Sequence, residues 1–494
     1  GDLDIGGRFM LVDHVASRAP RIRAACKCYY RRRLFSRRGG AGRAAPLVHP
    51  PPGRVSEALT AAYRVLDNSA LRPRRAGWGV TMGAPSRKML AVFLRLIALY
   101  AACELLSLAG MRLADAVRGH RLEAGAAVLS PERLAEVEAL LSPEAAEKTM
   151  TVFDRALGWG LRPDFGAGGQ KTNSAGIVAL REYAEHPPPG VVRIAAFGES
   201  FTQCAVRNEA TWERVLEESC PGIEVLNFGV SAYGPDQAYL RYLRDGRRYR
   251  PGIVLIGFMT ENIWRLVNVF RPYADPENTP LAKPRFLIAG GPLRLVENPL
   301  RGADDLNGLR TLNSDQVMRD RLGEHDRFYR RSYYSAPPSL VRFSPLARLV
   351  WDAFRVLSWK AADARGLDII GRDGRYNSSS EAYRILEALL DQWAADISRD
   401  GAIPVVLIFP QRSDIEKWRA GKPKQYQPLL GLLRGKGIMS IDLMDAFRSC
   451  ALAGAFTRDG HYNEAGNRLV AARVGRALQG WGLLPGPCAR MERP

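Results

Sequence analysis

Short apolar runs alternate with longer mixed stretches along much of the chain beyond residue 190. The apolar runs have the length of buried strands, and the mixed stretches have the composition of helices. Strands are expected at 194–197, 224–227, 253–258 and 404–409, and helices at 212–219, 236–249, 379–398 and 464–478. Because alternation of this kind implies a parallel sheet flanked by helices, the pattern predicts an α/β fold.

This alternation is absent from two segments. Residues 112–189 are expected to hold a helix at 131–157 and then short strands joined by glycines, which lead into a main domain at 190–480. Residues 271–377 are rich in proline, aromatic residues and arginine, and they are too many for an ordinary loop. We interpret 271–377 as an insertion. It is either a cap that selects substrate, with aromatic rings stacking on sugars and arginines meeting anionic groups, or a purely structural element.

A continuous apolar segment at 89–111 is long enough to span a bilayer. Arg95 and Glu104 interrupt it, and Arg87 and Lys88 precede it as a positive flank. This arrangement favours an N-terminal signal anchor, with one transmembrane helix and the remainder of the chain exported. The alternative is an amphipathic or core helix.

The formal net charge of +20 is concentrated at the N-terminus, where the first 88 residues hold 18 Lys/Arg and 5 Asp/Glu. This part has no sustained periodicity, which predicts a basic disordered tail at 1–88. Such a tail would bind anionic lipid or nucleic acid as a cationic arm, or remain solvated. A third interpretation is that residues 1–81 are translated upstream sequence and Met82 is the natural start. The rest of the chain is only mildly basic, so no specific nucleic-acid partner is expected.

A candidate nucleophile, Ser200, follows the apolar run at 191–197 and precedes a stretch that can start a helix. The carboxyl ends of parallel strands meet where ligands bind, and a helix N-terminus stabilises negative charge beside it. A serine hydroxyl is a weak nucleophile and requires a base. Of the six histidines, only His461 follows an expected strand, at 438–443, and has a carboxylate, Asp459, nearby in the sequence. We therefore expect Ser200 and Asp459 both to lie within hydrogen-bond reach of His461.

Four sequence blocks occur in a characteristic order. The first is Gly198-Glu199-Ser200, the second is VLNFGVSAY at 225–233, the third is IVLIGFMTENI at 253–263, and the last is the Asp459/His461 pair. Together they resemble the SGNH (GDSL-type) hydrolase family over roughly 172–478. Within that family, the Asp-x-His spacing resembles the spacing found in a bacterial membrane-anchored, O-acyltransferase-like subgroup. The family usually has Asp at the position of Glu199 and Gly-x-Asn-Asp around Asn262, where this chain has Glu261 and Ile263 as neighbours.

The resemblance implies a flavodoxin-like three-layer fold and acyl-transfer chemistry. Its catalytic residues would be Ser200, Asp459 and His461. Its oxyanion hole would use the backbone N–H groups of Ser200 and Ala232 and the amide of Asn262. Ala232 stands where the family has glycine, with Gly229 and Gly234 flanking it. No cofactor or metal is implied.

The implied function is a serine-dependent esterase or O-acyltransferase, acting on an acylated envelope glycan or lipid. The implied location is a bacterial inner membrane, with the catalytic domain on the periplasmic side. The alternative is a non-catalytic, membrane-tethered SGNH-fold protein that binds glycans. An exported domain would allow one or two disulfides among Cys204, Cys220, Cys450 and Cys488, for example Cys450 to Cys488, although the sequence does not assign partners.

Overall fold

The computed structural model describes residues 87–118, 127–142, 144, 147–334, 341, 343–366 and 369–489. Contacts along the chain separate two units, Gly1–Ala84 and Pro85–Pro494, and the fold described below is that of the second. The basic tail expected at 1–88 lies outside the described residues except at its last two positions.

The centre of the domain is a five-stranded sheet in the order β11-β10-β7-β5-β6, and every neighbouring pair is parallel. The strands are β5 (Val192–Phe197), β6 (Ile223–Asn227), β7 (Ile253–Met259), β10 (Ile403–Phe409) and β11 (Met439–Asp442). All residues of β6 and β7 are buried, as expected for strands covered on both faces. Numbered along the chain, this order is 2-1-3-4-5, which is the flavodoxin-like arrangement. The predicted α/β fold with a parallel sheet is confirmed.

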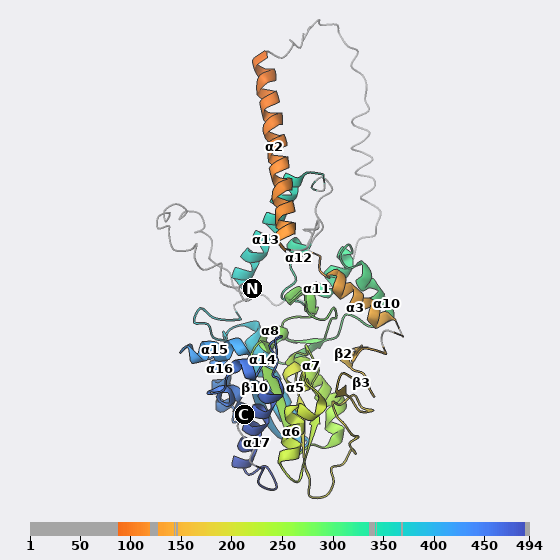
Figure 1. The fold of residues 1–494 in the computed structure, drawn as a ribbon, viewed down its shortest axis with the longest axis vertical. Helices are drawn as coiled ribbons and strands as arrows, with labels where there is room; N and C mark the ends of the chain where they lie inside the picture. Colours follow the sequence, from red (N-terminus) through yellow and green to blue (C-terminus); the bar gives the residue numbers. More distant parts are fainter. Residues whose placement is uncertain are drawn as a thin grey trace, which may run out of the picture. The chain divides into compact units, whose positions relative to one another are not determined.

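Helices cover both faces of this sheet (Figure 1). The main ones are α6 (Trp212–Ser219), α7 (Pro235–Arg241), α14 (Glu381–Arg399), α15 (Arg412–Arg419), α16 (Gln427–Gly435) and α17 (Glu464–Gly480). The helix α6 packs against α17, whereas α7 packs against α14. Since the strand order reverses at β5, right-handed connections place these two pairs on opposite faces. The helix expected at 236–249 is α7 continued by a π-helical turn (Tyr242–Gly246) and a 3₁₀ turn (Arg247–Tyr249).

The segment before the sheet differs from the sequence-based expectation. A helix, α3 (Pro131–Leu141), ends well before residue 157. It is followed by β1 (Thr151–Asp154), which pairs antiparallel with β2 (Gly158–Leu161). The tight turn between them forms because Asp154 Oδ1 accepts the N–H groups of both Ala156 and Leu157 at 2.9 Å. The helix prediction was therefore wrong at 151–157, whereas the glycine-joined strands expected afterwards are present as β3 (Gly166–Ala167) and β4 (Gln170–Lys171).

The region 271–377 has its own secondary structure. It contains α9 (Arg271–Ala274), the hairpin β8 (Arg285–Ile288) and β9 (Leu293–Val296), α10 (Ala303–Gly308), α11 (Gln316–Gly323), α12 (Arg331–Tyr334) and α13 (Pro345–Gly366). This region also holds the 3₁₀ segment Leu309–Thr311. Short turns elsewhere are α8 (Asn262–Arg265) and the 3₁₀ segments Asn208–Ala210, Leu443–Phe447 and Leu452–Gly454. The 22-residue helix α13 was not expected from the sequence.

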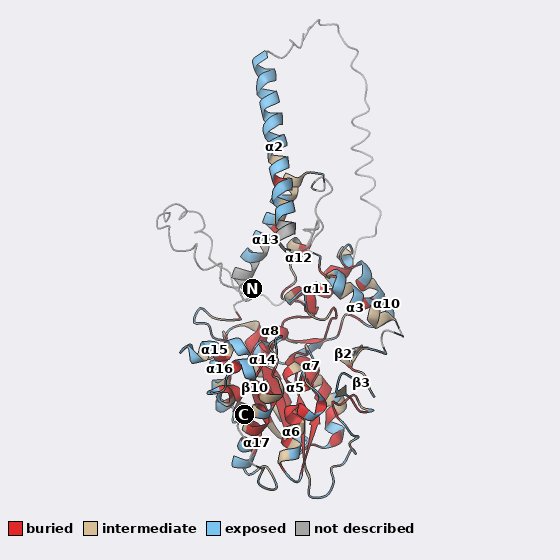
Figure 2. Cartoon of the chain, viewed as in Figure 1, coloured by how far each residue is buried: buried red, intermediate tan, exposed pale blue. Residues whose placement is uncertain are grey.

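The apolar segment near the N-terminus forms one long helix, α2 (Arg87–Arg118). Its residues 87–113 are long and apolar enough to cross a membrane, and none of its most apolar window is buried inside the protein. Figure 2 shows most of α2 as exposed, in contrast to the buried sheet. This contrast argues against the alternative of an ordinary core helix.

A disulfide joins Cys220 to Cys488, so the Cys450 to Cys488 pairing offered as an example was wrong. The chain after α17 returns to the end of α6, where Ala489 N donates to Ser219 O at 2.7 Å. This return brings Cys488 to Cys220, which immediately follows α6. Cys450 is a free thiol.

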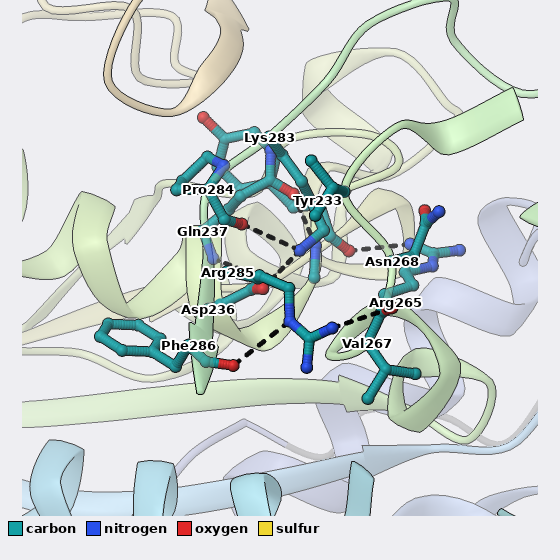
Figure 3. A network of polar contacts seen from close by, with 12 residues as sticks. Tyr233, Asp236, Gln237, Arg265, Val267, Asn268, Lys283, Pro284, Arg285 and Phe286 are labelled. Carbon is teal, nitrogen blue, oxygen red and sulfur yellow. Dashed lines mark hydrogen bonds and ion pairs between the residues drawn. The ribbon is translucent and has the colours of Figure 1, made fainter. Parts of the chain in front are cut away.

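The insertion is tied to the sheet domain by a fully buried ion pair between Lys283 and Asp236 (Figure 3). The Lys283 ammonium also donates to the Pro284 carbonyl at 3.1 Å. Burial lowers the pKa of Lys283, and the charge of Asp236 opposes that shift. Asp236 lies in the first turn of α7, next to the loop that follows β6. A residue of the insertion therefore supports the start of a helix that belongs to the sheet domain.

Replacing Lys283 with Met should lower the free energy of unfolding by roughly 3–5 kcal/mol, because it leaves the Asp236 carboxylate buried without its partner. Urea unfolding followed by circular dichroism measures the loss. The double variant Lys283→Met/Asp236→Leu should recover part of it, since both charges are then removed. Arg310→Met, which removes an exposed pair with Glu138, is the matched control and should change stability much less. Equal losses in Lys283→Met and Arg310→Met would contradict the argument.

Candidate active site

Ser200 lies at a sharp turn between β5 and the short helix α5 (Ser200–Gln203). The turn requires glycine at 198, because a Cβ there would lie 2.2 Å from Thr202 Oγ1 and 3.2 Å from the Gly257 Cα. Ser200 is the first residue of α5, so its backbone N–H has no partner within the helix. The turn thus holds the Ser200 hydroxyl and a backbone donor together at the carboxyl end of β5.

The structure brings Ser200, His461 and Asp459 into one hydrogen-bonded chain. His461 Nε2 lies 2.9 Å from Ser200 Oγ, and His461 Nδ1 lies 3.0 Å from Asp459 Oδ2. An ionised carboxylate only accepts hydrogen bonds, so Nδ1 carries the proton and Nε2 is left to accept the serine hydroxyl. Residues 261 apart in sequence therefore meet in the geometry of a nucleophile, a base and an orienting acid.

Thr457 supports this arrangement, and the sequence analysis missed it. Its hydroxyl donates to Asp459 Oδ1, while its backbone N–H donates to the His461 carbonyl at 2.8 Å. The hydrogen bonds from Thr457 and then His461 lower the pKa of Asp459, and its 66% exposed side chain also favours the ionised form. The sequence does place the Thr457 hydroxyl two residues before Asp459. That spacing brings the two side chains together only because the chain turns at Gly460 (φ 89°).

Aromatic packing fixes the histidine ring from the side of the core. The Phe201 ring lies 5.4 Å from the His461 ring between centroids. The neighbouring Tyr462 is buried, contacts Phe201 edge-on at 4.6 Å and donates its hydroxyl to Pro410 O at 2.7 Å. Because Phe201 follows the nucleophile and Tyr462 follows the base, the same ring contact sets the position of both functional residues.

The loop after β6 leaves one backbone donor available. From Phe228 to Gly234, the N–H groups of all residues except Ala232 donate to other described groups, namely to Ala196 O, Asn227 Oδ1, Gly198 O, Gln203 Oε1, Val230 O and Gln237 Oε1. Ala232 N has no such acceptor within the described chain. This is the N–H that the sequence analysis assigned to an oxyanion hole.

The two glycines that flank Ala232 serve close packing. A Cβ at Gly229 would lie 2.1 Å from Gln203 N, so this residue lets the loop approach the end of α5. A Cβ at Gly234 would lie 2.4 Å from Asp236 Oδ1. Ala232 itself has φ 65°, in the left-handed region that glycine adopts more easily. Ala232, which stands where the SGNH resemblance places a glycine, therefore has a left-handed backbone conformation.

Asn262 is buried at the end of β7 and contacts Glu199, the residue before the nucleophile. Asn262 Nδ2 donates one hydrogen bond to Glu199 Oε2 at 3.0 Å, and its second N–H remains for another acceptor. Burial raises the pKa of Glu199, and the positive charge of Arg265 opposes the shift. The sequence analysis noted Glu199 only as a departure from the family. Its contact with Asn262 depends on two neighbouring strands, which sequence spacing does not reveal.

The described residues contain no group of three or more His, Cys, Asp or Glu side chains placed to hold a metal ion. The described chain therefore offers serine, histidine and carboxylate chemistry at the carboxyl edge of the sheet. Within the described chain, the side-chain hydrogen bonds of Ser200 and His461 involve no residue from 271–377.

No protein-family model and no curated protein matches the chain. Solved structures that match include a member of the lipolytic protein G-D-S-L family from Veillonella parvula, at 11% identity over 58% of this chain and 99% of that one, with a TM-score of 0.29. A lipase/acylhydrolase from Enterococcus faecalis matches at 12% identity over 59% and 97%, with a TM-score of 0.28. A catalytic mutant of an acetylxylan esterase from Geobacillus stearothermophilus matches at 13% identity over 58% and 93%, with a TM-score of 0.29.

These identities and scores are too low to carry an argument about function. The strand order of the sheet and the four blocks at its carboxyl edge carry the description of the fold. In those terms, the described domain has the SGNH-type hydrolase fold.

Ala232→Gly should raise the free energy of unfolding by about 1 kcal/mol, because it relieves a left-handed alanine. Thermal unfolding followed by circular dichroism measures the change. The matched control is Ala238→Gly, a buried alanine within α7, which should lower stability by about 1 kcal/mol or more. If both variants lose stability equally, the left-handed conformation of Ala232 is not the constraint described above.

Proposed function

We propose that this chain is a serine-dependent, SGNH-type enzyme that cleaves or transfers the acyl group of an ester. The observation that carries the proposal is the contact of His461 with both Ser200 (2.9 Å) and Asp459 (3.0 Å). A histidine held between a serine and a carboxylate has a defined use in acyl transfer, whereas a glycan-binding surface does not require it.

In the proposed reaction, Ser200 Oγ attacks the ester carbonyl while His461 Nε2 takes the hydroxyl proton. The tetrahedral intermediate collapses, the ester C–O bond breaks, and His461 returns the proton to the leaving alcohol. Water or an acceptor hydroxyl then attacks the acyl-serine while His461 takes its proton. The bond between the acyl carbon and Ser200 Oγ breaks, and His461 returns the proton to Ser200 Oγ. Asp459 stabilises the imidazolium in both halves of the reaction, and its low pKa suits that role.

The negative charge on the former carbonyl oxygen would be met by the N–H groups of Ser200 and Ala232 and by the second N–H of Asn262. Each such donor is typically worth on the order of 100- to 1000-fold in rate. Burial raises the pKa of Glu199, while the positive charge of Arg265 opposes that shift. The hydrogen bond from Asn262 to Glu199 would orient the Asn262 amide toward the oxyanion.

We further propose that the substrate is an acylated glycan or lipid of the bacterial envelope, and that the acyl group is transferred to water or to a sugar hydroxyl. The location supports this class. The chain would be held in the inner membrane by α2, with Arg87 and Lys88 on the cytoplasmic side. The Cys220–Cys488 disulfide supports export of the domain, because such bonds persist in oxidising compartments.

Ser200→Ala should abolish covalent labelling by a fluorophosphonate probe and reduce turnover of p-nitrophenyl acetate to background, because no other group supplies the nucleophile. Asp459→Asn leaves Ser200 in place but should lower kcat by on the order of 10⁴-fold. The Asn amide no longer holds the proton on His461 Nδ1, so Nε2 cannot serve as the base. Ser314→Ala, at an exposed serine of the insertion, is the control and should label normally. A wild-type protein that folds but never labels would favour the non-catalytic alternative. Undiminished turnover in Ser200→Ala would refute the nucleophile.

The exported location predicts that Cys220 and Cys488 are oxidised in living cells. Acid quenching, alkylation and peptide mass spectrometry should recover them as one disulfide-linked pair, with Cys450 alkylated as an internal thiol control. Full alkylation of Cys220 and Cys488 in freshly quenched cells would place the domain in a reducing compartment instead.

A further inference from the structure

The helix α13, within the insertion, has its polarity reversed relative to an ordinary surface helix. Its large apolar side chains point outward, with exposed fractions between 41% and 66% for Leu349, Val350, Phe354, Val356 and Leu357. In a soluble protein the apolar side of such a helix faces the core and the polar side faces water. An outward apolar surface of this extent therefore requires a covering.

The charged residues in the middle of α13 point inward. Arg355 is only 6% exposed, its Nη2 lies 3.3 Å from Asp352 Oδ1, and its guanidinium lies 5.3 Å from the centre of the Tyr333 ring. Charges that face the protein interior while apolar side chains face outward are typical of helices surrounded by lipid. The pattern thus indicates that the outward side of α13 contacts an apolar environment such as a lipid bilayer.

The start of α13 is bound to α2 through Glu104, the acidic residue that interrupts the apolar span. The Glu104 carboxylate accepts the Leu346 N–H at 2.9 Å and the Ser344 hydroxyl, and α13 lies beside α2 (Figure 1). A helix N-terminus stabilises negative charge, and a polar group in hydrocarbon must be satisfied within the protein. Glu104 meets that requirement through α13, which accounts for an acid inside an otherwise apolar helix.

The position of this contact fixes its depth along α2. Glu104 precedes Leu113, the last residue of the candidate span, by nine residues, which corresponds to about 14 Å of helix. A hydrocarbon core is about 30 Å thick, so the start of α13 would lie within it whenever α2 crosses the bilayer. Both helices carry exposed large apolar side chains, and the two helices are in contact.

We propose that α13 is a second membrane-embedded element, which enters the bilayer beside α2 and whose apolar side chains, from Leu349 to Leu357, contact lipid acyl chains. The insertion at 271–377 then serves to seat the catalytic domain on the membrane by two points of attachment rather than one. This inference requires that α2 spans a membrane, and it does not depend on the catalytic proposal.

Photo-crosslinking of the full-length chain tests it. We would place p-benzoylphenylalanine at Val350 or Leu357 in α13, reconstitute the protein in phosphatidylethanolamine/phosphatidylglycerol vesicles that contain an alkyne-tagged phospholipid, irradiate, and detect tagged lipid on the protein. Leu99 in α2 is the positive control. Val317 in α11, which is 79% exposed, is the matched apolar control on the water-facing part of the insertion. The melting temperature of each variant verifies folding.

The expected result is lipid adducts at Val350 and Leu357 at least five-fold above those at Val317 and comparable to those at Leu99. Adducts at Leu99 with only Val317-like background at both α13 positions would overturn the proposal. Protein–protein adducts in place of lipid adducts at α13 would also overturn it, because a second copy of the chain would then cover this surface. Absence of adducts at Leu99 would also overturn the proposal, because α2 would then not lie in the bilayer. Fluorophosphonate labelling of Ser200 would still test the catalytic proposal separately.

Discussion

Burial of a parallel sheet on both faces is the constraint on which the rest of this domain depends. It commits β5, β6 and β7 to nearly continuous apolar sequence, in which the only charged side chains, Arg193 and Glu224, pair with each other. The strand order reverses at β5, so the connections leaving β5 and β6 diverge and open a crevice at the carboxyl edge. Ser200 follows β5, the loop of Ala232 follows β6, and Asn262 follows β7. The candidate site is therefore a consequence of topology: three consecutive strand ends supply the nucleophile and the oxyanion donors, and the chain after β11 supplies the histidine.

Acidic side chains near the nucleophile are accommodated in two different ways. Burial raises the pKa of Glu199 and, more strongly, that of Glu213, whose Oε2 lies 3.6 Å from the Cys204 thiol. Both environments favour the uncharged acid. Asp236, which is equally buried, is instead matched by the Lys283 ammonium from the insertion. The carboxylate of the triad, Asp459, differs from all three because it is 66% exposed.

The sequence was sufficient for features governed by local spacing and by the apolar pattern. Strand ends such as Phe197 and Phe409 were predicted because buried strands are short apolar runs, and the pairing of Asp459 with His461 was visible two residues apart. Features that depend on distant contacts were missed. Residues 151–154 form a strand only because β2 folds back on them, Cys220 meets Cys488 only after the chain has crossed the whole domain, and Glu199 contacts Asn262 across two strands. The helix α13 was missed for another reason: its outward apolar side does not match the pattern of a helix that packs against a soluble core.

The Cys220–Cys488 bond also bears on how the domain is assembled during synthesis. It encloses 268 residues of separation, a span that includes four of the five central strands and the histidine loop. Because the chain is synthesised from its N-terminus, Cys488 is made only after β6, β7, β10, β11 and α17. The bond therefore cannot guide the choice among early strand pairings. It forms late and fastens the chain that follows α17 to the end of α6, so it protects the C-terminal segment from fraying.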